Sequence, residues 1–129
     1  MEYNQFIKHV QTAAQLDSRD VAIKATQAVL ETVRERILGN ECAQLAAQLA
    51  PELQQYLLGR EGEMGDHFPI EEFYQRICSK AGVEADQAAI YARAVFSTLS
   101  EAVSAGEFAD VRSNFSQDYD EMFATGTTA

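Results

Sequence analysis

The chain has 129 residues, 47% of them hydrophobic, which is typical of about one folded domain and excludes general disorder. Twenty acidic and 10 basic residues give a net charge of −10, which disfavours nucleic acids and anionic membranes as partners and leaves a protein partner or self-association. No apolar run approaches the roughly 20 residues of a membrane-spanning helix, no secretory signal is evident, and the two cysteines have no metal-site spacing, so we expect a cytoplasmic protein.

Apolar residues recur at helical spacing along the chain, and no segment alternates with the period of a strand. In the first half this pattern predicts a medium helix over residues 2–14. A long helix of about 20 residues follows, capped by Asp17 or Ser18 and ending near Gly39. Asn40 is then expected to cap one short helix, and Pro51 to open a second, because a proline lacks only an N–H that has no partner there.

Residues 59–69, "GREGEMGDHFP", interrupt the helical periodicity with glycines and acidic residues and are interpreted as a linker. The second half again predicts a medium, a long and two short helices. Pro69 is expected to open the medium helix and Glu84 to start the long one. Gly106 is expected to precede the first short helix, and Ser116 to cap the second. Residues 125–129 are interpreted as a frayed tail.

The two halves resemble each other in sequence. "TQAVLETVRE" at 26–35 aligns with "ARAVFSTLSE" at 92–101, an offset of 66, and one inserted residue places Phe6 opposite Phe73 in equivalent core positions. This similarity predicts two tandem four-helix repeats, about 2–58 and about 69–124. Because a unit of about 60 residues is marginally stable alone, we predict one all-α, bundle-like domain of eight helices over 1–124. Two independent units are the alternative.

The second half carries larger side chains at equivalent apolar positions. Leu30, Cys42, Leu49, Leu53 and Leu57 correspond to Phe96, Phe108, Phe115, Tyr119 and Phe123. Two interpretations follow from this difference. Either the second half has a bulkier core, or some of these aromatic residues line a groove for a ligand or a partner helix.

Three segments carry a family resemblance: "QAVLETVRERILGNECAQLAAQLAPELQQYLL", "IEEFYQRI" and "ARAVFSTLSEAVSAGEFADVRSNFSQDYDEMF". In this order they resemble the bacterial family called "domain of unknown function 2267" over about residues 2–124. The chain departs from the family pattern in its short "GREGEMGDHF" connection and in "LAPEL" where "LPEEL" is usual. The resemblance implies a small, cytoplasmic, helical bacterial protein, and it brings no established activity and no catalytic residues.

Metal and cofactor sites are not predicted. Carboxylate-bundle proteins bind metal through Glu-x-x-His pairs, but neither His9 nor His67 has a glutamate three residues before it. His9 lies beside an apolar stripe and is interpreted as a boundary residue, and His67 in the linker as a solvated one. Glu31 and Glu35 alternate with two arginines, a pattern typical of a charged solvent face.

Cys42 leaves two alternatives open. It lies near the start of a short helix, where the pKa of an outward-facing thiol is lowered, but its equivalent is Phe108, which favours a buried apolar position. Cys78 has no evident base beside it. A reactive thiol would require Cys42 to face solvent.

Other functional motifs do not occur. The sequence contains no phosphate-binding loop, nucleophile elbow or dinucleotide fingerprint, so we expect a protein that is not an enzyme. The junction "LGNE" suggests a helix-turn-helix, but the following "CAQLAAQLA" holds no Arg or Lys and its counterpart offers only Arg112, so DNA binding is not expected.

These observations favour a non-enzymatic interaction or regulatory module with no catalytic, cofactor-binding or metal-binding residues. The alternative is a small-ligand-binding or thiol-based redox-sensing protein that uses Cys42 or an aromatic groove in the second repeat.

Overall fold

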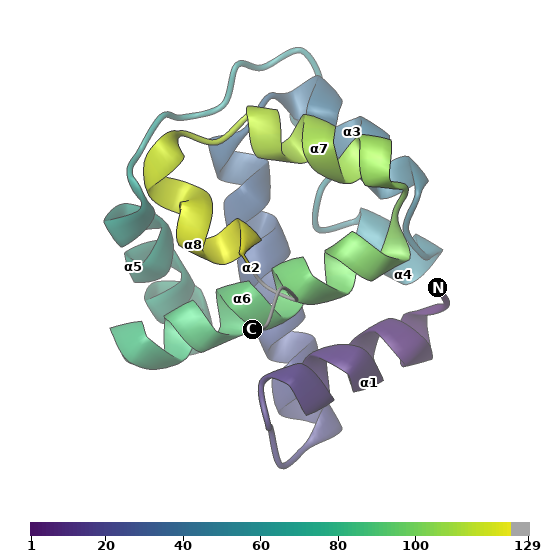
Figure 1. The fold of residues 1–129 in the computed structure, drawn as a ribbon, viewed down its shortest axis with the longest axis vertical. Helices are drawn as coiled ribbons and strands as arrows, with labels where there is room; N and C mark the ends of the chain where they lie inside the picture. The colour runs from purple at the N-terminus through teal and green to yellow at the C-terminus, as the bar shows by residue number, and fades with distance from the viewer. Residues whose placement is uncertain (125–129) are drawn as a thin grey trace.

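The computed structural model describes residues 1–124, and within them it contains eight α-helices, one short 3-10 helix and no strand (Figure 1). In chain order the elements are α1 (Tyr3–Ala13), α2 (Arg19–Arg36), α3 (Gly39–Ala47), α4 (Pro51–Gln54), α5 (Ile70–Ala81), α6 (Ala85–Ala102), α7 (Ala105–Ser113), η1 (Gln117–Tyr119) and α8 (Asp120–Phe123). The all-α prediction is therefore confirmed. The predicted tail, 125–129, lies outside the described residues.

Several helix ends lie where local chemistry predicts them. Ser18 caps α2, its side chain accepting a hydrogen bond from the Val21 N–H at 3.2 Å, and Pro51 is the first residue of α4. Pro69 and Glu84 are the residues just before α5 and α6. The predicted order of medium, long and short helices is correct in both halves.

The start of α3 differs from the prediction. α2 ends at Arg36, near Gly39 as predicted, and Gly39 itself is the first residue of α3. Asn40 does not cap α3, since its Oδ1 accepts a hydrogen bond from the Gly62 N–H at 2.9 Å. The cause is the connection 59–69, which folds back onto this junction. A Cβ at Gly39 would lie 1.6 Å from the Arg60 carbonyl oxygen, so only glycine fits there.

The start of α7 and the last turn also differ. Gly106 lies inside α7, which begins at Ala105 after its cap Ser104. The Ser104 side chain accepts from the Glu107 N–H at 3.1 Å, a stronger helix-start signal than the glycine. Ser116 precedes η1 without capping it, because its hydroxyl is engaged with Asp118.

The two long helices bind the halves together. α2 and α6 contact each other, and each also contacts both medium helices, α1 and α5. α3 and α7 lie side by side at one end, seen at the top of Figure 1. Each half thus completes its packing with helices of the other half.

Contacts between α3 and α7 are reciprocal. The Leu38 N–H at the start of α3 donates to Asn114 Oδ1 at the end of α7, at 3.4 Å. The Ser104 N–H at the start of α7 donates to Gln48 Oε1 at the end of α3, at 2.8 Å. The two helices are therefore antiparallel. The two bonds are also equivalent at the offset of 66, because Leu38 corresponds to Ser104 and Gln48 corresponds to Asn114. The tandem duplication itself stays a prediction.

An aromatic cluster forms the core of the second half. Phe73 is fully buried, with ring centroids of Phe96 at 6.5 Å, Phe115 at 6.0 Å and Tyr119 at 5.5 Å, all edge-on. Such edge-to-face contacts add to the stabilisation from area burial alone. The bulkier-core interpretation is therefore correct for Phe96, Phe115 and Tyr119.

Arg36, at the end of α2, is only 3% exposed. Its Nε donates to the Phe68 carbonyl at 2.9 Å, Nη1 to the Asn114 carbonyl at 3.3 Å and Nη2 to Ser116 Oγ at 3.3 Å. Its guanidinium also lies 5.1 Å from the Tyr119 ring centroid. One side chain of the first half thus contacts both the connection and the stretch 114–119 of the second half.

We predict that residues 1–62 and 66–129, produced separately, are each far less stable than the full chain. Each half loses the apolar surface that α2, α6, α1 and α5 bury across the boundary. Thermal unfolding followed by circular dichroism measures this. If either half melted cooperatively at the melting temperature of the full chain, the prediction that the two halves form one cooperative unit would be contradicted.

We predict that Phe73→Ala lowers the free energy of unfolding by about 3–5 kcal/mol, through lost transfer energy and the cavity left behind. Phe6→Ala, also at a fully buried position, should cost a similar amount. Phe108→Ala is the matched control, because that ring is half-buried and should cost about 1 kcal/mol. Urea unfolding measures the free energy of unfolding of all three variants. Equal losses at positions 73 and 108 would contradict the difference in burial between these two rings.

Candidate functional site

Cys42 is a buried core residue. Its side chain is 0% exposed, and burial raises the pKa of its thiol to about 12. The thiolate, which is the reactive form, is therefore disfavoured at neutral pH. The buried alternative for Cys42 is correct, and the redox alternative loses its support. Cys78 is half-buried and free.

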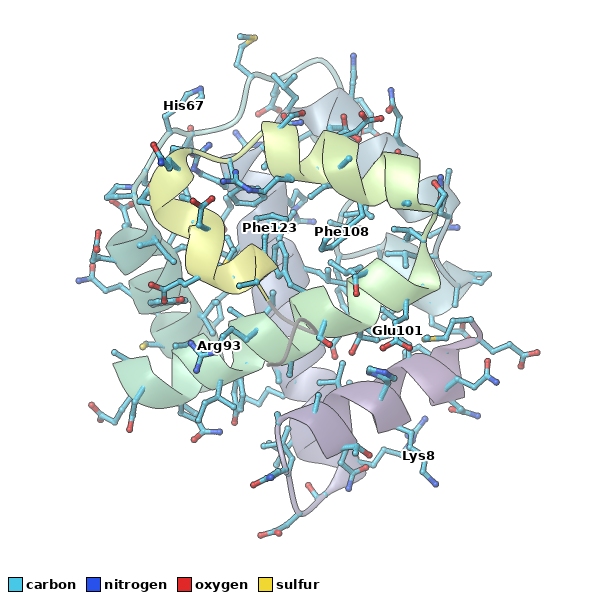
Figure 2. The ribbon with its side chains drawn as sticks, viewed as in Figure 1. Lys8, His67, Arg93, Glu101, Phe108 and Phe123 are labelled. Atoms are coloured by element: carbon cyan, nitrogen blue, oxygen red, sulfur yellow. The ribbon has the colours of Figure 1, made fainter. Side chains whose placement is uncertain are left out.

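His9 is a boundary residue, as predicted, and it joins the two halves. Its Nδ1 lies 2.9 Å from Thr98 Oγ1, and its Nε2 lies 3.0 Å from Glu101 Oε2. Both contacts hold α1 against α6. The Thr98 hydroxyl also donates to the Ala94 carbonyl within α6, at 2.8 Å. His67 is exposed in the connection, again as predicted (Figure 2).

The predicted charged solvent face of α2 is wrong for Glu35 as well as for the buried Arg36. Glu35 Oε1 lies 3.1 Å from Arg76 Nη1 and 3.0 Å from Lys80 Nζ, both on α5. Burial alone would raise the pKa of Glu35, but the hydrogen bonds and charges of Lys80 and Arg76 outweigh it and leave that pKa below its usual 4.5. Glu35 on α2 therefore links the first half to α5 of the second half through two ion pairs. Glu31, one turn earlier, accepts a hydrogen bond from Gln27 Nε2 on the same helix, at 3.0 Å.

Three carboxylates meet where α3 and α7 adjoin. Glu41 lies in the first turn of α3, Glu107 in the first turn of α7, and Asp110 one turn later in α7. One oxygen from each lies within 4.8 Å of the other two. We call Glu41, Glu107 and Asp110 the carboxylate cluster.

The carboxylate cluster is graded in exposure. Glu107 is 7% exposed, Glu41 is half-buried and Asp110 is exposed. Burial and the neighbouring Glu41 raise the pKa of Glu107 to about 8. The Oε2 atoms of Glu41 and Glu107 are buried with no hydrogen-bond partner. Within residues 1–124, no basic side chain forms an ion pair with the cluster.

Two of the second-half aromatics line an open groove between α6, α7 and α8. Phe108 of α7 and Phe123 of α8 are half-buried, with ring centroids 5.5 Å apart, and Figure 2 shows both facing the space between these helices. The groove has a volume of about 520 Å³. It is lined by Ser100, Ala105, Phe108, Ala109, Arg112, Asp120, Phe123 and Ala124. We call it the aromatic groove.

Arg112 closes one side of the aromatic groove. It pairs with Asp120, donates from Nη1 to the Phe115 carbonyl at 2.9 Å, and its guanidinium lies 5.1 Å from the Phe123 ring centroid. Ala105 and Ala109 on α7 are exposed, so the groove floor is apolar and its wall is charged. Phe108 and Phe123 thus line a groove, as the second interpretation of the larger side chains predicts, and the binding of a ligand or a partner helix there stays a prediction.

Sequence reasoning missed the carboxylate cluster. The signal was present, because Glu41 and Glu107 recur at the offset of 66. Their meeting requires the antiparallel packing of α3 against α7, which no spacing along the chain expresses. The fold thus brings together two acidic residues that are equivalent in the sequence repeat.

Comparison with known proteins identifies a family without an assigned role. The sequence matches a family model described as "Uncharacterized conserved protein (DUF2267)" over residues 3–122, which confirms the resemblance found in the sequence. No curated protein matches the chain. Within residues 1–124, no helix has both the length and the apolar character that crossing a membrane requires.

We predict that Glu35→Gln destabilises the protein by about 1 kcal/mol at neutral pH, because it removes both charge pairs to α5. A lowered pKa means that Glu35 stabilises the fold above pH 4.5 and loses this effect as the pH falls through its folded-state value. The variant should therefore lose less stability than wild type in acid. Urea unfolding between about pH 7 and pH 3 measures this, with Glu31→Gln as control. Identical acid profiles of wild type and Glu35→Gln would contradict the pairing.

Proposed function

We propose that this chain, which belongs to the DUF2267 family of uncharacterised conserved proteins, is a non-enzymatic binding module that receives a basic amphipathic helix of a partner protein in its aromatic groove. The observation that carries the proposal is the groove itself. Phe108 and Phe123 are half-buried and leave part of their rings open to the groove, whereas Phe96, Phe115 and Tyr119 at the other repeat-equivalent positions are buried.

The shape of the groove supports a helical occupant. Small residues, Ala105 and Ala109, lie one turn apart on α7 and leave room for side chains of a second helix. A partner helix would insert one or two apolar residues spaced three or four apart between Phe108 and Phe123. Buried aromatic contacts of this kind supply most of the energy in protein interfaces.

Charge supports a basic occupant. The net charge of −10 attracts positively charged surfaces and raises their association rate. At the groove, Asp120 is paired with Arg112 but remains 61% exposed, so it can accept a cation from the partner. An acidic or nucleic-acid partner would be repelled.

A second candidate is a small apolar ligand in the same groove. The volume of the aromatic groove, about 520 Å³, falls in the range of small-molecule pockets. Such a ligand would copurify with the protein and be detected by native mass spectrometry. The thiol-based form of this alternative is disfavoured by the buried Cys42.

We predict that Ala109→Arg abolishes partner capture by filling the groove and repelling a basic helix. Ala47→Arg, an equally exposed alanine at the end of α3, is the matched control and should bind as wild type does. The partner is first captured from the native lysate, and its basic amphipathic segment is then titrated against each variant. We expect Ala109→Arg to weaken the affinity for this segment at least tenfold. Binding should weaken with added salt.

Other outcomes separate the candidates. Equal capture by Ala109→Arg and wild type would contradict the groove as the binding surface. A copurifying small molecule that Ala109→Arg loses would favour the ligand alternative. A dimer that forms with increasing concentration and is lost in Ala109→Arg would identify a second copy of the chain as the occupant.

A further inference from the structure

The carboxylate cluster lies on the face of α7 that contacts α3, away from the aromatic groove. An acidic residue in the first turn of a helix is ordinarily stabilising, because it lies near the positive end of the helix dipole. That explanation suits an exposed side chain. It does not explain why Glu107 is 7% exposed and has Glu41 and Asp110 as neighbours.

The second observation concerns unsatisfied oxygens. The Oε2 atoms of Glu41 and Glu107 are shielded from solvent and have no hydrogen-bond donor. A buried carboxylate without a donor or a cation is strongly unfavourable, so a positive species at this point would relieve the cost. In residues 1–124, no Arg, Lys or His supplies that charge.

We propose that Glu41, Glu107 and Asp110 bind a hard divalent cation, of the class of Mn²⁺, Ca²⁺ and Mg²⁺, between α3 and α7. Carboxylate oxygens are the ligands that these ions prefer. Oxygens within 4.8 Å of one another fit around one ion, because ligands on opposite sides of such an ion are about 4–5 Å apart. Zn²⁺, a borderline ion that is usually held by thiolate or imidazole ligands, is less favoured, since neither belongs to the cluster.

The arrangement also provides a route of entry. Asp110 is exposed and lies at the mouth, whereas Glu107 is buried behind it. A hydrated ion can exchange waters for Asp110 first and then for the two glutamates, and the remaining waters complete its coordination. This inference does not rest on the proposed binding of a helix, because Phe108 and Ala109 face the groove and not the cluster.

A bound cation would stabilise the protein. Glu41 and Glu107 come from the two halves, so the ion would join α3 to α7 across their boundary. Because only the folded state assembles the three ligands, the melting temperature should rise with ion concentration, by about 5 °C or more near saturation.

The test uses full-length protein freed of metal by a chelator and then dialysed. The melting temperature is measured with Mn²⁺, Ca²⁺ or Mg²⁺ up to about 5 mM, at about pH 8. Binding of Mn²⁺ is measured separately by its electron paramagnetic resonance signal. Wild type should bind about one Mn²⁺ and melt at a higher temperature with it. Glu107→Gln should lose both effects. Asp110→Asn, a change at an exposed residue, should weaken binding at least tenfold without loss of folding.

The matched control is Glu52→Gln, which removes the same charge from the exposed first turn of α4 and should bind Mn²⁺ as wild type does. The absence of Mn²⁺ binding by wild type would overturn the proposal. So would a rise in melting temperature that is equal in wild type and Glu107→Gln, since it would show that the ion acts elsewhere.

Discussion

The guanidinium of Arg36 is the interaction on which the arrangement of the second half depends. It is a buried cation held by carbonyls, hydroxyls and aromatic rings, and no carboxylate among residues 1–124 forms an ion pair with it. Burying a charge in this way is costly unless its donors are satisfied, so the acceptors around it cannot move independently. The Phe68 carbonyl, the Asn114 carbonyl and the Tyr119 hydroxyl are therefore fixed relative to the end of α2.

The positions of the carboxylate cluster and of the aromatic groove both depend on the contacts that Arg36 makes. Asn114, which offers its carbonyl to Arg36, offers its side-chain oxygen to the start of α3 and so holds α7 beside α3. Tyr119 donates to the Phe68 carbonyl at 2.6 Å and thereby fixes η1, from which α8 continues. The carboxylate cluster depends on the first contact and the aromatic groove on the second. Neither site could form if α7 and α8 were free to shift against α2.

How far the sequence predicts this molecule depends on the distance over which each interaction acts. Ser18 and Pro51 act within one turn, and both were predicted correctly. Gly39 and Arg36 act through the connection 59–69 and the end of α7, and their roles were missed. Arg36 follows Val33 by three residues and Val29 by seven, so the helical period does place it on the buried stripe. A charged residue on an otherwise apolar helix face is thus the one feature of the sequence that indicates a special role for Arg36. Its acceptors are backbone carbonyls, which carry no sequence signature.

Both candidate sites come from neighbouring residues on one short helix. Glu107 and Phe108 are consecutive, and consecutive residues in a helix point about 100° apart, so α7 presents a carboxylate to α3 and an aromatic ring to the groove. α7 is nine residues long, and its end is held by Asn114, whose carbonyl accepts from Arg36 and whose side-chain oxygen accepts from the Leu38 N–H. Glu41 and Glu107 would repel each other as two charged carboxylates, so a positive species between them favours the contact of α7 with α3. The same helix carries Phe108 into the aromatic groove. One short helix held at a fixed position therefore supplies a residue to each of the two surfaces.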